Sequence, residues 1–439
     1  MSEGGEDVPH LERGDLPPAI RVAPPGPEAR RLSTRLGAAE APGINTLAGD
    51  EPSLLWAEAL GANVLDVDGN RYVDLTAGFG VAAVGHRHPR VVEAVRRQAG
   101  RLLHALGDVH AHPARVELAE RLAARVPVAG AREEAVAVHP AISGSDAVEV
   151  AVKTALLASG RTTVLAFAPS YHGTTLGALA LTARDAFRRP FADHLHPHVR
   201  RLPFAAPEAE VEAALADGHV ACAVVEPIVG REGVLVPPAG WLAALAAACQ
   251  RSGTLLVADE VFTGFGRTGC WFAVEHDGVR PDLVACGKAL GGGLPIAAVV
   301  GRRGLMDAWA TGGEALHTAT FVANPLTCAA ALAVLDVLEE EALVQRAAVL
   351  GERLGERLAG WPERFAAVEA VRGRGALWGV ELATKEAAYG LVDGARARGV
   401  LLLAGGPEGR VAQLVPPLTI TDEQLETALD VLEEVLAGP

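Results

Sequence analysis

The stretch "DLVACGKALGGGLPIAAVVG", residues 282–301, carries one lysine in an otherwise apolar and glycine-rich setting. Apart from Asp282 at its start, Lys288 is its only charged residue, between the apolar run Leu283–Cys286 and the triple glycine Gly291–Gly293. Lysine is almost never fully buried unless it is paired. The stretch therefore predicts a buried strand that ends at a functional lysine.

Further apolar runs accompany this one, and together they indicate the fold class. They read "TVLAFA" (163–168), "VACAVVEP" (220–227), "TLLVADEV" (254–261) and "IAAVVG" (296–301), with helical stretches such as "SDAVEVAVKTALLAS" (145–159) and "WLAALAAACQRSG" (241–253) between several of them. Apolar runs without polar alternation indicate a sheet that is covered on both faces. Their alternation with helices predicts an α/β fold with a mostly parallel sheet.

The length of 439 residues allows two or three domains. Residues 1–42 are rich in proline, glycine and charge, which predicts a flexible lead-in. The other segments are an N-terminal part of a small domain (43–89, with a hairpin over 63–75), a large domain (90–335) and a C-terminal part of the small domain (336–439). We expect a long helix after Pro325 and a last helix that opens with a capping box from Thr421 to Gln424.

Composition and charge argue against several classes of function. The net charge of −15 disfavours a nucleic-acid partner. No apolar run is long enough for a membrane span, and the acidic start "MSEGGEDVPHLERGD" does not read as a signal peptide. The five cysteines lack CxxC spacing, and the alternating histidines His194, His196 and His198 have no carboxylate–cysteine cluster nearby. We therefore expect a cytoplasmic protein with reduced thiols and no metal site.

Polar residues end the apolar runs, where an open α/β sheet binds its ligands. Glu226, Asp259 and Lys288 each follow such a run. Upstream, Ser143-Gly144-Ser145 begins a predicted helix, whose free amide groups and dipole suit a phosphate. Taken singly, Glu226 could pair at a strand end, Asp259 could cap and Ser143–Ser145 could be an ordinary N-cap. Their combination with Lys288 predicts one crevice that holds a phosphate, an acid and a lysine.

Two nucleotide-binding patterns are incomplete. "LLVADE" resembles the acidic strand of a nucleotide hydrolase, but the glycine-rich loop GxxxxGK[ST] is absent, with Asp282 at its first glycine position and Ala289 after the lysine. "GFGRTG" (264–269) matches the dinucleotide pattern, but Gly278 and Pro281 break any long helix after it. A nicotinamide oxidoreductase is therefore a weaker alternative.

The predicted crevice suits pyridoxal phosphate. A desolvated lysine has a lowered pKa and becomes a nucleophilic amine that forms a Schiff base with an aldehyde. Pyridoxal phosphate supplies that aldehyde, a phosphate to anchor and a ring nitrogen that an aspartate can keep protonated. Lysine, acid and phosphate site match these three needs.

At these residues the chain resembles the class III aminotransferases. The matching strings are "SGSDAVEVAVKTA", "SYHGTTLGALALT", "VVEPIVGREGV", "LLVADEVFTGFGRTG", "GKALGGGLPIAAVVG", "TFVANPL" and "VPPLTIT", from about Gly43 to the C-terminus. The resemblance implies the aspartate-aminotransferase-like fold (PLP fold type I), with the small domain built from both ends of the chain. It implies transfer of an amino group from an amine or amino acid to a keto acid or aldehyde.

The resemblance also assigns roles around the cofactor ring. Lys288 would hold the cofactor as a Schiff base and shuttle the proton. Asp259 would pair with the ring nitrogen. Val261 and Tyr171 would pack on the two ring faces, with His172 close behind.

Further roles concern the phosphate and the ring edge. Ser143, Gly144 and Ser145 would bind the phosphate, and Glu226 matches the family's acid beside the ring. Thr320 would contact the phosphate of the neighbouring subunit, which implies a homodimer with shared active sites.

The chain departs from the family strings at several positions that bear on the identity of the substrate. Phe262 stands where glutamine is frequent, Ala323 where glycine is usual and Thr174 where arginine is common. Many relatives also carry an arginine three residues before "PPL" and a glutamate in the string after "EP". Here these positions hold Gln413 and Arg231.

We hypothesise that the cation has moved and that Arg231 holds an anionic group of one substrate, with Gln413 as a neutral partner. In the alternative, Arg231 points to solvent or pairs with Glu232, and Arg410 holds that group. An aminomutase, racemase or decarboxylase would start from the same cofactor linkage, and a non-catalytic binding protein would not need Lys288.

Overall fold

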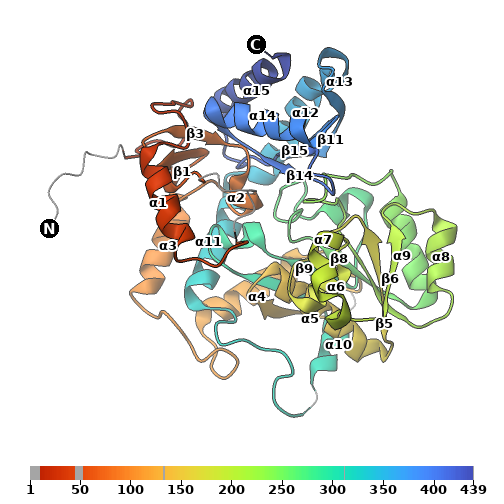
Figure 1. Cartoon of the computed structure of the whole chain (residues 1–439). Helices are drawn as coiled ribbons and strands as arrows, with labels where there is room; N and C mark the ends of the chain where they lie inside the picture. The colour runs from red at the N-terminus through yellow and green to blue at the C-terminus, as the bar shows by residue number, and fades with distance from the viewer. Residues whose placement is uncertain (1–9, 45–52, 132–133, 311, 439) are drawn as a thin grey trace.

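The computed structural model describes residues 10–44, 53–131, 134–310 and 312–438, and a seven-stranded sheet lies at its centre (Figure 1). In spatial order its strands are β4 (Val136–Ala141), β10 (Ala297–Arg302), β9 (Leu283–Cys286), β8 (Leu255–Asp259), β7 (Val220–Val225), β5 (Thr163–Ala168) and β6 (Val199–Pro203). Neighbours from β9 to β6 pair in parallel, whereas β10 is antiparallel to both β9 and β4. The predicted α/β fold with a mostly parallel sheet is confirmed.

Both faces of this sheet are buried, as the uninterrupted apolar runs predict. In β9, Leu283 and Ala285 belong to the hydrophobic cluster on the side of α5 (Gly144–Ser159). The alternate residues Val284 and Cys286 belong to the larger cluster on the other side. Successive side chains of a strand point to opposite faces, so a strand covered twice must be apolar at every position.

The helices of the central part flank the sheet. They are α3 (Pro89–Ala99), α4 (Pro113–Arg125), α6 (Leu176–Leu181), α7 (Asp185–Arg188), α8 (Glu208–Leu215), α9 (Trp241–Ser252), α10 (Arg303–Met306) and α11 (Pro325–Glu340), with 3-10 turns η1 (Arg189–His194), η2 (Ala273–Asp277), η3 (Lys288–Gly291) and η4 (Asp307–Trp309). Helix α11 begins at Pro325 as predicted, and the boundary expected at 335/336 falls inside it. None of the described helices is long and apolar enough to cross a bilayer.

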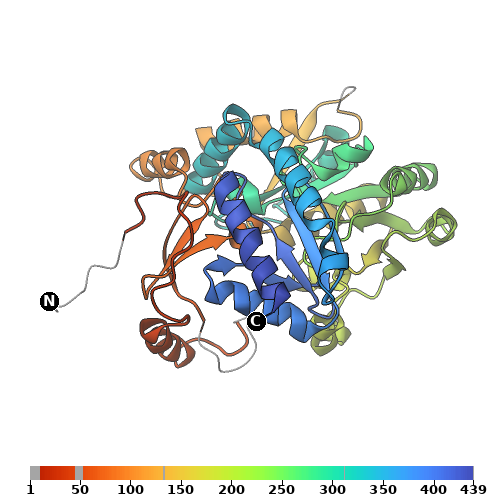
Figure 2. The same cartoon turned by 90° about the horizontal axis from the view of Figure 1, so that it is seen from above.

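Two smaller sheets join the ends of the chain. One has the order β1 (Trp56–Leu60), β2 (Asn63–Asp66), β3 (Arg71–Asp74) and β13 (Val400–Leu401), and the other β11 (Val368–Arg374), β12 (Leu377–Leu382), β15 (Val411–Leu414) and β14 (Leu403–Gly405). The first contains the predicted hairpin, and β13 pairs with β3 across most of the sequence. Both views place the N-terminal segment beside the C-terminal one (Figures 1 and 2).

Helices complete this smaller part. They are α1 (Pro27–Gly37), α2 (Ala77–Gly80), α12 (Leu343–Leu358), α13 (Trp361–Arg364), α14 (Lys385–Ala397) and α15 (Asp422–Ala437). The predicted capping box is present at α15, where Thr421 and Gln424 bond to each other's backbone amides.

The expected flexible lead-in is wrong for residues 10–42. Side chains of the hairpin bind its backbone: Asp68 accepts from the amides of Glu28 and Ala29 at 2.8 and 2.9 Å. Asn70 accepts from the amides of Arg21 and Val22 at 2.8 and 3.0 Å. Polar composition alone did not indicate these partners. Residues 1–9 of the expected lead-in lie outside the described residues.

Candidate active site

Glu226, Asp259 and Lys288 lie at the same edge of the central sheet. They end or follow β7, β8 and β9, which are adjacent and parallel. Because parallel strands present their carboxyl ends at one edge, the three side chains share one crevice. The N-terminus of α5 follows β4, and Val261 packs against Gly144 there.

Asp259 is buried, and each of its carboxylate oxygens has one hydrogen-bond partner. One carboxylate oxygen lies 2.7 Å from Nδ1 of His172, and the other accepts from the amide of Val261 at 3.1 Å. Burial disfavours the imidazolium of His172, but the hydrogen bond and charge of Asp259 outweigh it and raise the pKa of His172. The second ring nitrogen, Nε2, is buried without a hydrogen-bond partner.

Glu226 ties two backbone segments to this pair. It accepts from the amide of Tyr171 at 2.8 Å and from the amide of Gly230 at 2.9 Å. Burial raises its pKa to about 7. The carboxylate thereby fixes the loops that carry Tyr171 and Arg231.

Lys288 begins the turn η3 with a positive φ of 42° and is half-buried. Burial lowers the pKa of its amine to about 8, so the neutral form is far more populated near neutral pH than it is for a free lysine. Its Nζ lies 3.8 Å from the centroid of the Phe262 ring. Gly80 and Gly230 flank that ring so closely that a Cβ at either would collide with it.

The start of α5 is a small and open cradle. Ser143 is the N-cap, and its Oγ accepts from the amide of Asp146 at 3.2 Å. A Cβ at Gly144 would lie 2.8 Å from Cγ1 of Val261, so the close approach of the Val261 side chain to this turn requires glycine. Oγ of Ser145 accepts from the amide of Thr174 at 3.2 Å, which brings the loop after His172 to the cradle.

Arg231 is held by aromatic rings. Its guanidinium carbon lies 4.5 Å from the ring centroid of Tyr171 and 5.2 Å from that of Phe187. Gln413 is buried, and its Nε2 donates to the carbonyls of Gly230 at 2.9 Å and Arg231 at 3.2 Å. The two residues named as substrate candidates are therefore neighbours.

The two residues named in the alternative hypothesis, Glu232 and Arg410, form ion pairs with other residues. Glu232 is buried and forms its ion pair with Arg184, at 3.4 Å. Arg410 pairs with Glu369, Glu381 and Glu408 at 3.0, 3.0 and 3.1 Å. Three carboxylates already surround the Arg410 guanidinium, which argues against Arg410 as the residue that holds a substrate.

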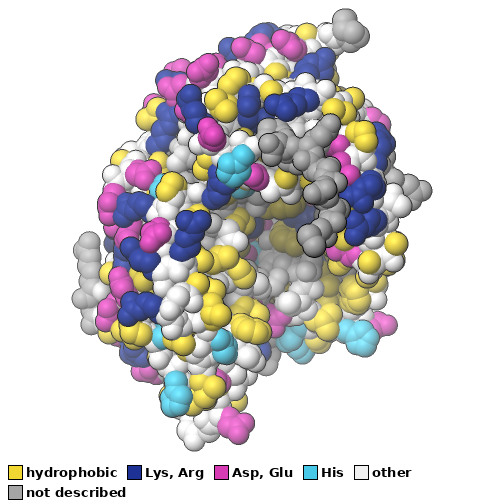
Figure 3. Space-filling model, turned by 90° about the vertical axis from the view of Figure 1, so that its left-hand side faces the viewer, with side chains coloured by type: hydrophobic (Ala, Val, Ile, Leu, Met, Phe, Trp, Pro, Cys, Tyr) yellow, Lys and Arg dark blue, Asp and Glu magenta, His cyan; other side chains and the backbone are white. Residues whose placement is uncertain are grey.

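Thr320 lies on the segment between η4 and α11 and not at a strand end of the central sheet. It is exposed, and its carbonyl lies near Gly107. Around it, the rings of His104 and Phe321 are 5.3 Å apart, and Asn324 donates to the carbonyl of Leu103 at 3.0 Å. Figure 3 shows that one face of the molecule is hollowed, with hydrophobic side chains gathered around the hollow.

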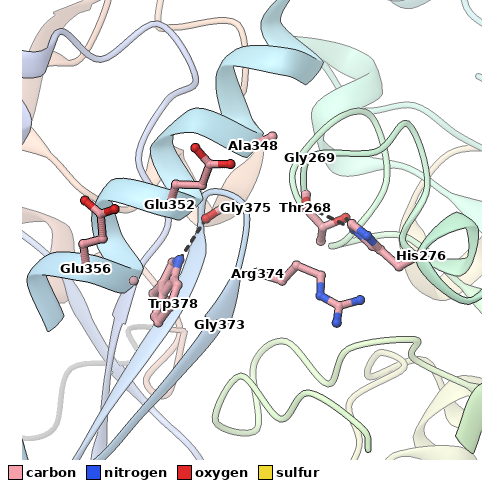
Figure 4. Close-up of a pocket in the computed structure, with 12 residues that line it drawn as sticks. Thr268, Gly269, His276, Ala348, Glu352, Glu356, Gly373, Arg374, Gly375 and Trp378 are labelled. Carbon is pink, nitrogen blue, oxygen red and sulfur yellow. Dashed lines mark hydrogen bonds between the residues drawn. The ribbon is translucent and has the colours of Figure 1, made fainter. Parts of the chain in front are cut away.

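The nicotinamide alternative fails in the structure. After "GFGRTG" the chain forms turns and the short η2, and no α-helix follows there to receive a pyrophosphate. A cavity of about 540 Å³ does lie beside this loop, between it, α12 and the β11–β12 hairpin (Figure 4). Its walls are mostly glycine, alanine and charged side chains, and none of the predicted site residues lines it.

The sequence did not predict the roles of three neighbours of the crevice. The ring of Phe187 stacks against the guanidinium of Arg231. Arg184 pairs with Glu232 and also donates to the carbonyl of Gly406 at 2.7 Å. Gly173 has a φ of 128°, and a Cβ there would overlap Ser145. Of the three, Gly173 lies within the string that carries Tyr171 and His172.

Comparison with known proteins identifies the family. The chain matches the family Aminotransferase class-III over residues 47–436. It is 42% identical over 387 residues to the acetylornithine aminotransferase of Mycobacterium tuberculosis (strain ATCC 25618 / H37Rv), covering 88% of this chain and 92% of that protein. The ornithine aminotransferase structure from Toxoplasma gondii ME49 is similar with a TM-score of 0.83 at 30% identity, over 92% of this chain and 95% of that one. A PLP-bound amine transaminase from an uncultivated Pseudomonas species gives 0.82 at 31%, over 91% and 99%.

The fold and the crevice fit a pyridoxal-phosphate enzyme of the α/β type, and the comparisons show which family of these enzymes it is. The chain belongs to the class III aminotransferases and is a pyridoxal-phosphate-dependent aminotransferase. Its own residues fit the cofactor: Lys288 has a lowered pKa, Gly144 keeps the cradle free of side chain, and Asp259 is oriented by His172 and a backbone amide. No cluster of metal-ligating side chains occurs within the described residues.

Proposed function

We propose that Lys288 is the catalytic base and cofactor anchor of this aminotransferase. Bound pyridoxal phosphate supplies an aldehyde for the amine and a ring that accepts electrons. Lys288 would hold it and, once the incoming amine displaces it, would take and return the proton at the substrate carbon. The lowered pKa of about 8 supports this role, because a base acts in its neutral form and that form is easier to reach near neutral pH.

Asp259 would face the ring nitrogen and keep it protonated. Its bonds to His172 and to the amide of Val261 fix both carboxylate oxygens, so the charge is oriented before the ligand arrives. Val261 and Tyr171 would pack on the two faces of the ring. Glu226 would lie beside it and hold the backbone of Tyr171.

The phosphate would bind at the start of α5, among Ser143, Gly144 and Ser145. Free amides and the helix dipole favour an anion at that end. Thr320 would reach the phosphate of a second copy, which makes the enzyme a homodimer. Exposed apolar side chains support this, since Leu103 is 59% and Phe321 66% exposed in one chain.

Arg231 would bind an anionic group of one substrate, an amino acid or a keto acid. Stacking on Tyr171 and Phe187 holds the guanidinium while its N–H groups stay available. Gln413 would support the backbone beneath it.

The free cysteines fit an enzyme of the cytoplasm.

The observation that carries the proposal is the lysine with a lowered pKa at the strand edge beside a buried, oriented aspartate. The test is borohydride reduction of the enzyme loaded with pyridoxal phosphate, followed by peptide mapping. The adduct is expected on the peptide containing Lys288, and an adduct elsewhere would overturn the assignment. Sedimentation should give a dimer, and a fully active monomer at high dilution would contradict the role of Thr320.

A further inference from the structure

The segment that carries Thr320 has few attachments to the rest of the chain. Residues 312–320, as described, contain neither helix nor strand, and most of their side chains are exposed. They connect η4 to the helix α11 that begins at Pro325. Within these residues, the side-chain hydrogen bonds that reach another part of the fold come from His317.

His317 binds two charged residues of α5. Its Nε2 lies 2.7 Å from Oδ1 of Asp146, and Nζ of Lys153 lies 2.8 Å from its Nδ1. An ammonium can only donate, so Nδ1 accepts and the ring proton sits on Nε2, which donates to the carboxylate. Both ring nitrogens are therefore bonded to side chains of α5.

Aromatic residues fix the plane of this ring. The ring centroid of Trp309 lies 6.3 Å from that of His317, and the ring of His139 lies 6.0 Å away. The indole of Trp309 donates to Oγ1 of Thr154 at 2.9 Å, which ties η4 to α5. The His317 side chain is only 15% exposed in this pocket.

Asp146 also belongs to the first turn of α5. Its other carboxylate oxygen accepts from the amide of Ile142 at 2.8 Å, and its own amide donates to Ser143. One carboxylate thus binds the turn that forms the cradle and the segment that carries Thr320. Displacing His317 would release the segment and leave Asp146 with one partner fewer.

We propose that His317 is a positioning residue for phosphate binding at both sites of the dimer. The inference rests on the proposed function, in which Ser143–Ser145 bind the phosphate of their own site and Thr320 reaches the other. Through Asp146, His317 positions the cradle of one site. Through the segment that leads to Thr320, it positions the residue that would contact the phosphate of the second site. Neither role requires His317 to touch the ligand.

The test uses equilibrium binding of pyridoxal phosphate and of inorganic phosphate to the apoenzyme. His317→Leu removes both hydrogen bonds and should weaken binding of each by about tenfold, since each tenfold corresponds to about 1.4 kcal/mol and bonds to charged groups are of that order. His317→Gln keeps a donor and an acceptor and should restore most of the affinity. At saturating cofactor, kcat of the leucine variant should stay within about twofold of wild type, because the proton-transferring groups are untouched.

His139→Leu is the matched control, because His139 packs against the same ring without bonding the segment. It should leave cofactor affinity unchanged, and an equal loss in both variants would assign the effect to packing and overturn the proposal. Wild-type affinity in His317→Leu would also overturn it. If borohydride reduction of the wild-type enzyme gave no cofactor adduct on Lys288, the proposed function itself would be wrong.

Hybrid dimers separate the two sites. A chain with Lys288→Ala lacks the catalytic base, so a hybrid with wild type has one site that can turn over. When His317→Leu is placed in the inactive chain, it should weaken cofactor binding at the competent site, because the Thr320 of that site comes from the altered chain. His317→Leu in the active chain should weaken it as well. Loss only in the second hybrid would overturn the link between the sites.

Discussion

The two halves of the crevice are built by different interactions. In the half that fits the cofactor, Asp259 and Glu226 are buried and bonded to backbone amides, and Asp259 also to His172. In the half that would meet the substrate, Arg231 stacks on the rings of Tyr171 and Phe187, and the ring of Phe262 lies against the amine of Lys288. The first half keeps the family strings, whereas the second departs from them at Arg231, Phe262 and Gln413.

The difference has a physical cause. A buried carboxylate that loses a partner keeps its full desolvation penalty, so every member of a bonded network constrains the others. A guanidinium or ammonium that stacks on a ring keeps its N–H donors free for other partners, and an aromatic contact tolerates several geometries. The cofactor half therefore resists change, and the substrate half can be altered one side chain at a time.

The largest effect is expected for Lys288→Ala, which removes the base and the anchor. Turnover should fall to background, because within the described part of the chain no other lysine ends a strand of the central sheet. Cofactor should still bind through the cradle at Ser143–Ser145. Steady-state assays with equilibrium dialysis of the cofactor check both, and a variant that retained substantial turnover would remove Lys288 from the mechanism.

Asp259→Asn should have the next largest effect. Asparagine keeps the shape but removes the charge that would face the ring nitrogen, and the loss of one such preorganised group costs on the order of 10²–10³ in kcat. Cofactor affinity should change much less than kcat. A loss below about tenfold in kcat would show that Asp259 only orders the loop at Val261.

Local signals in the sequence predicted the cofactor half well. An apolar run followed by a polar residue marks a strand end, and parallel strands bring such ends together, so Glu226, Asp259 and Lys288 could be named from the chain. The N-cap at Ser143 and the hairpin over 63–75 are equally local. The central sheet followed from the same patterns.

The substrate half and the N-terminal segment depended on contacts without a local pattern. Phe187 and Arg231 are far apart in the sequence, and only the folded loops bring the ring beneath the guanidinium. Similarly, the amides of Glu28 and Ala29 find the carboxylate of Asp68 in a hairpin that composition does not connect to them. Long-range partners of this kind require the structure.

Arg231→Ala tests the substrate half directly. It should raise KM for substrates with an extra anionic group by about 10- to 150-fold, the equivalent of about 1.5–3 kcal/mol for a bond to a charged group. Matched amines without that group should be unaffected. Gln413→Ala should have a smaller effect, and Arg410→Ala should have none because its guanidinium serves a surface ion cluster. A silent Arg231→Ala would refute the relocated cation.

The smallest expected effect concerns the contact between Lys288 and Phe262. The ring face stabilises the ammonium, whereas burial disfavours it and sets the pKa near 8. Phe262→Leu keeps an apolar neighbour but removes the ring, so the protonated form loses about 0.5–1 kcal/mol and the pKa should fall by roughly 0.4–0.7. The pH dependence of modification of Lys288 in the apoenzyme by an amine-reactive reagent, followed by peptide mapping, measures this midpoint. Phe262→Tyr retains a ring and should leave the midpoint in place. A midpoint that rises in the leucine variant would show that the ring acts on Lys288 through desolvation rather than through its face.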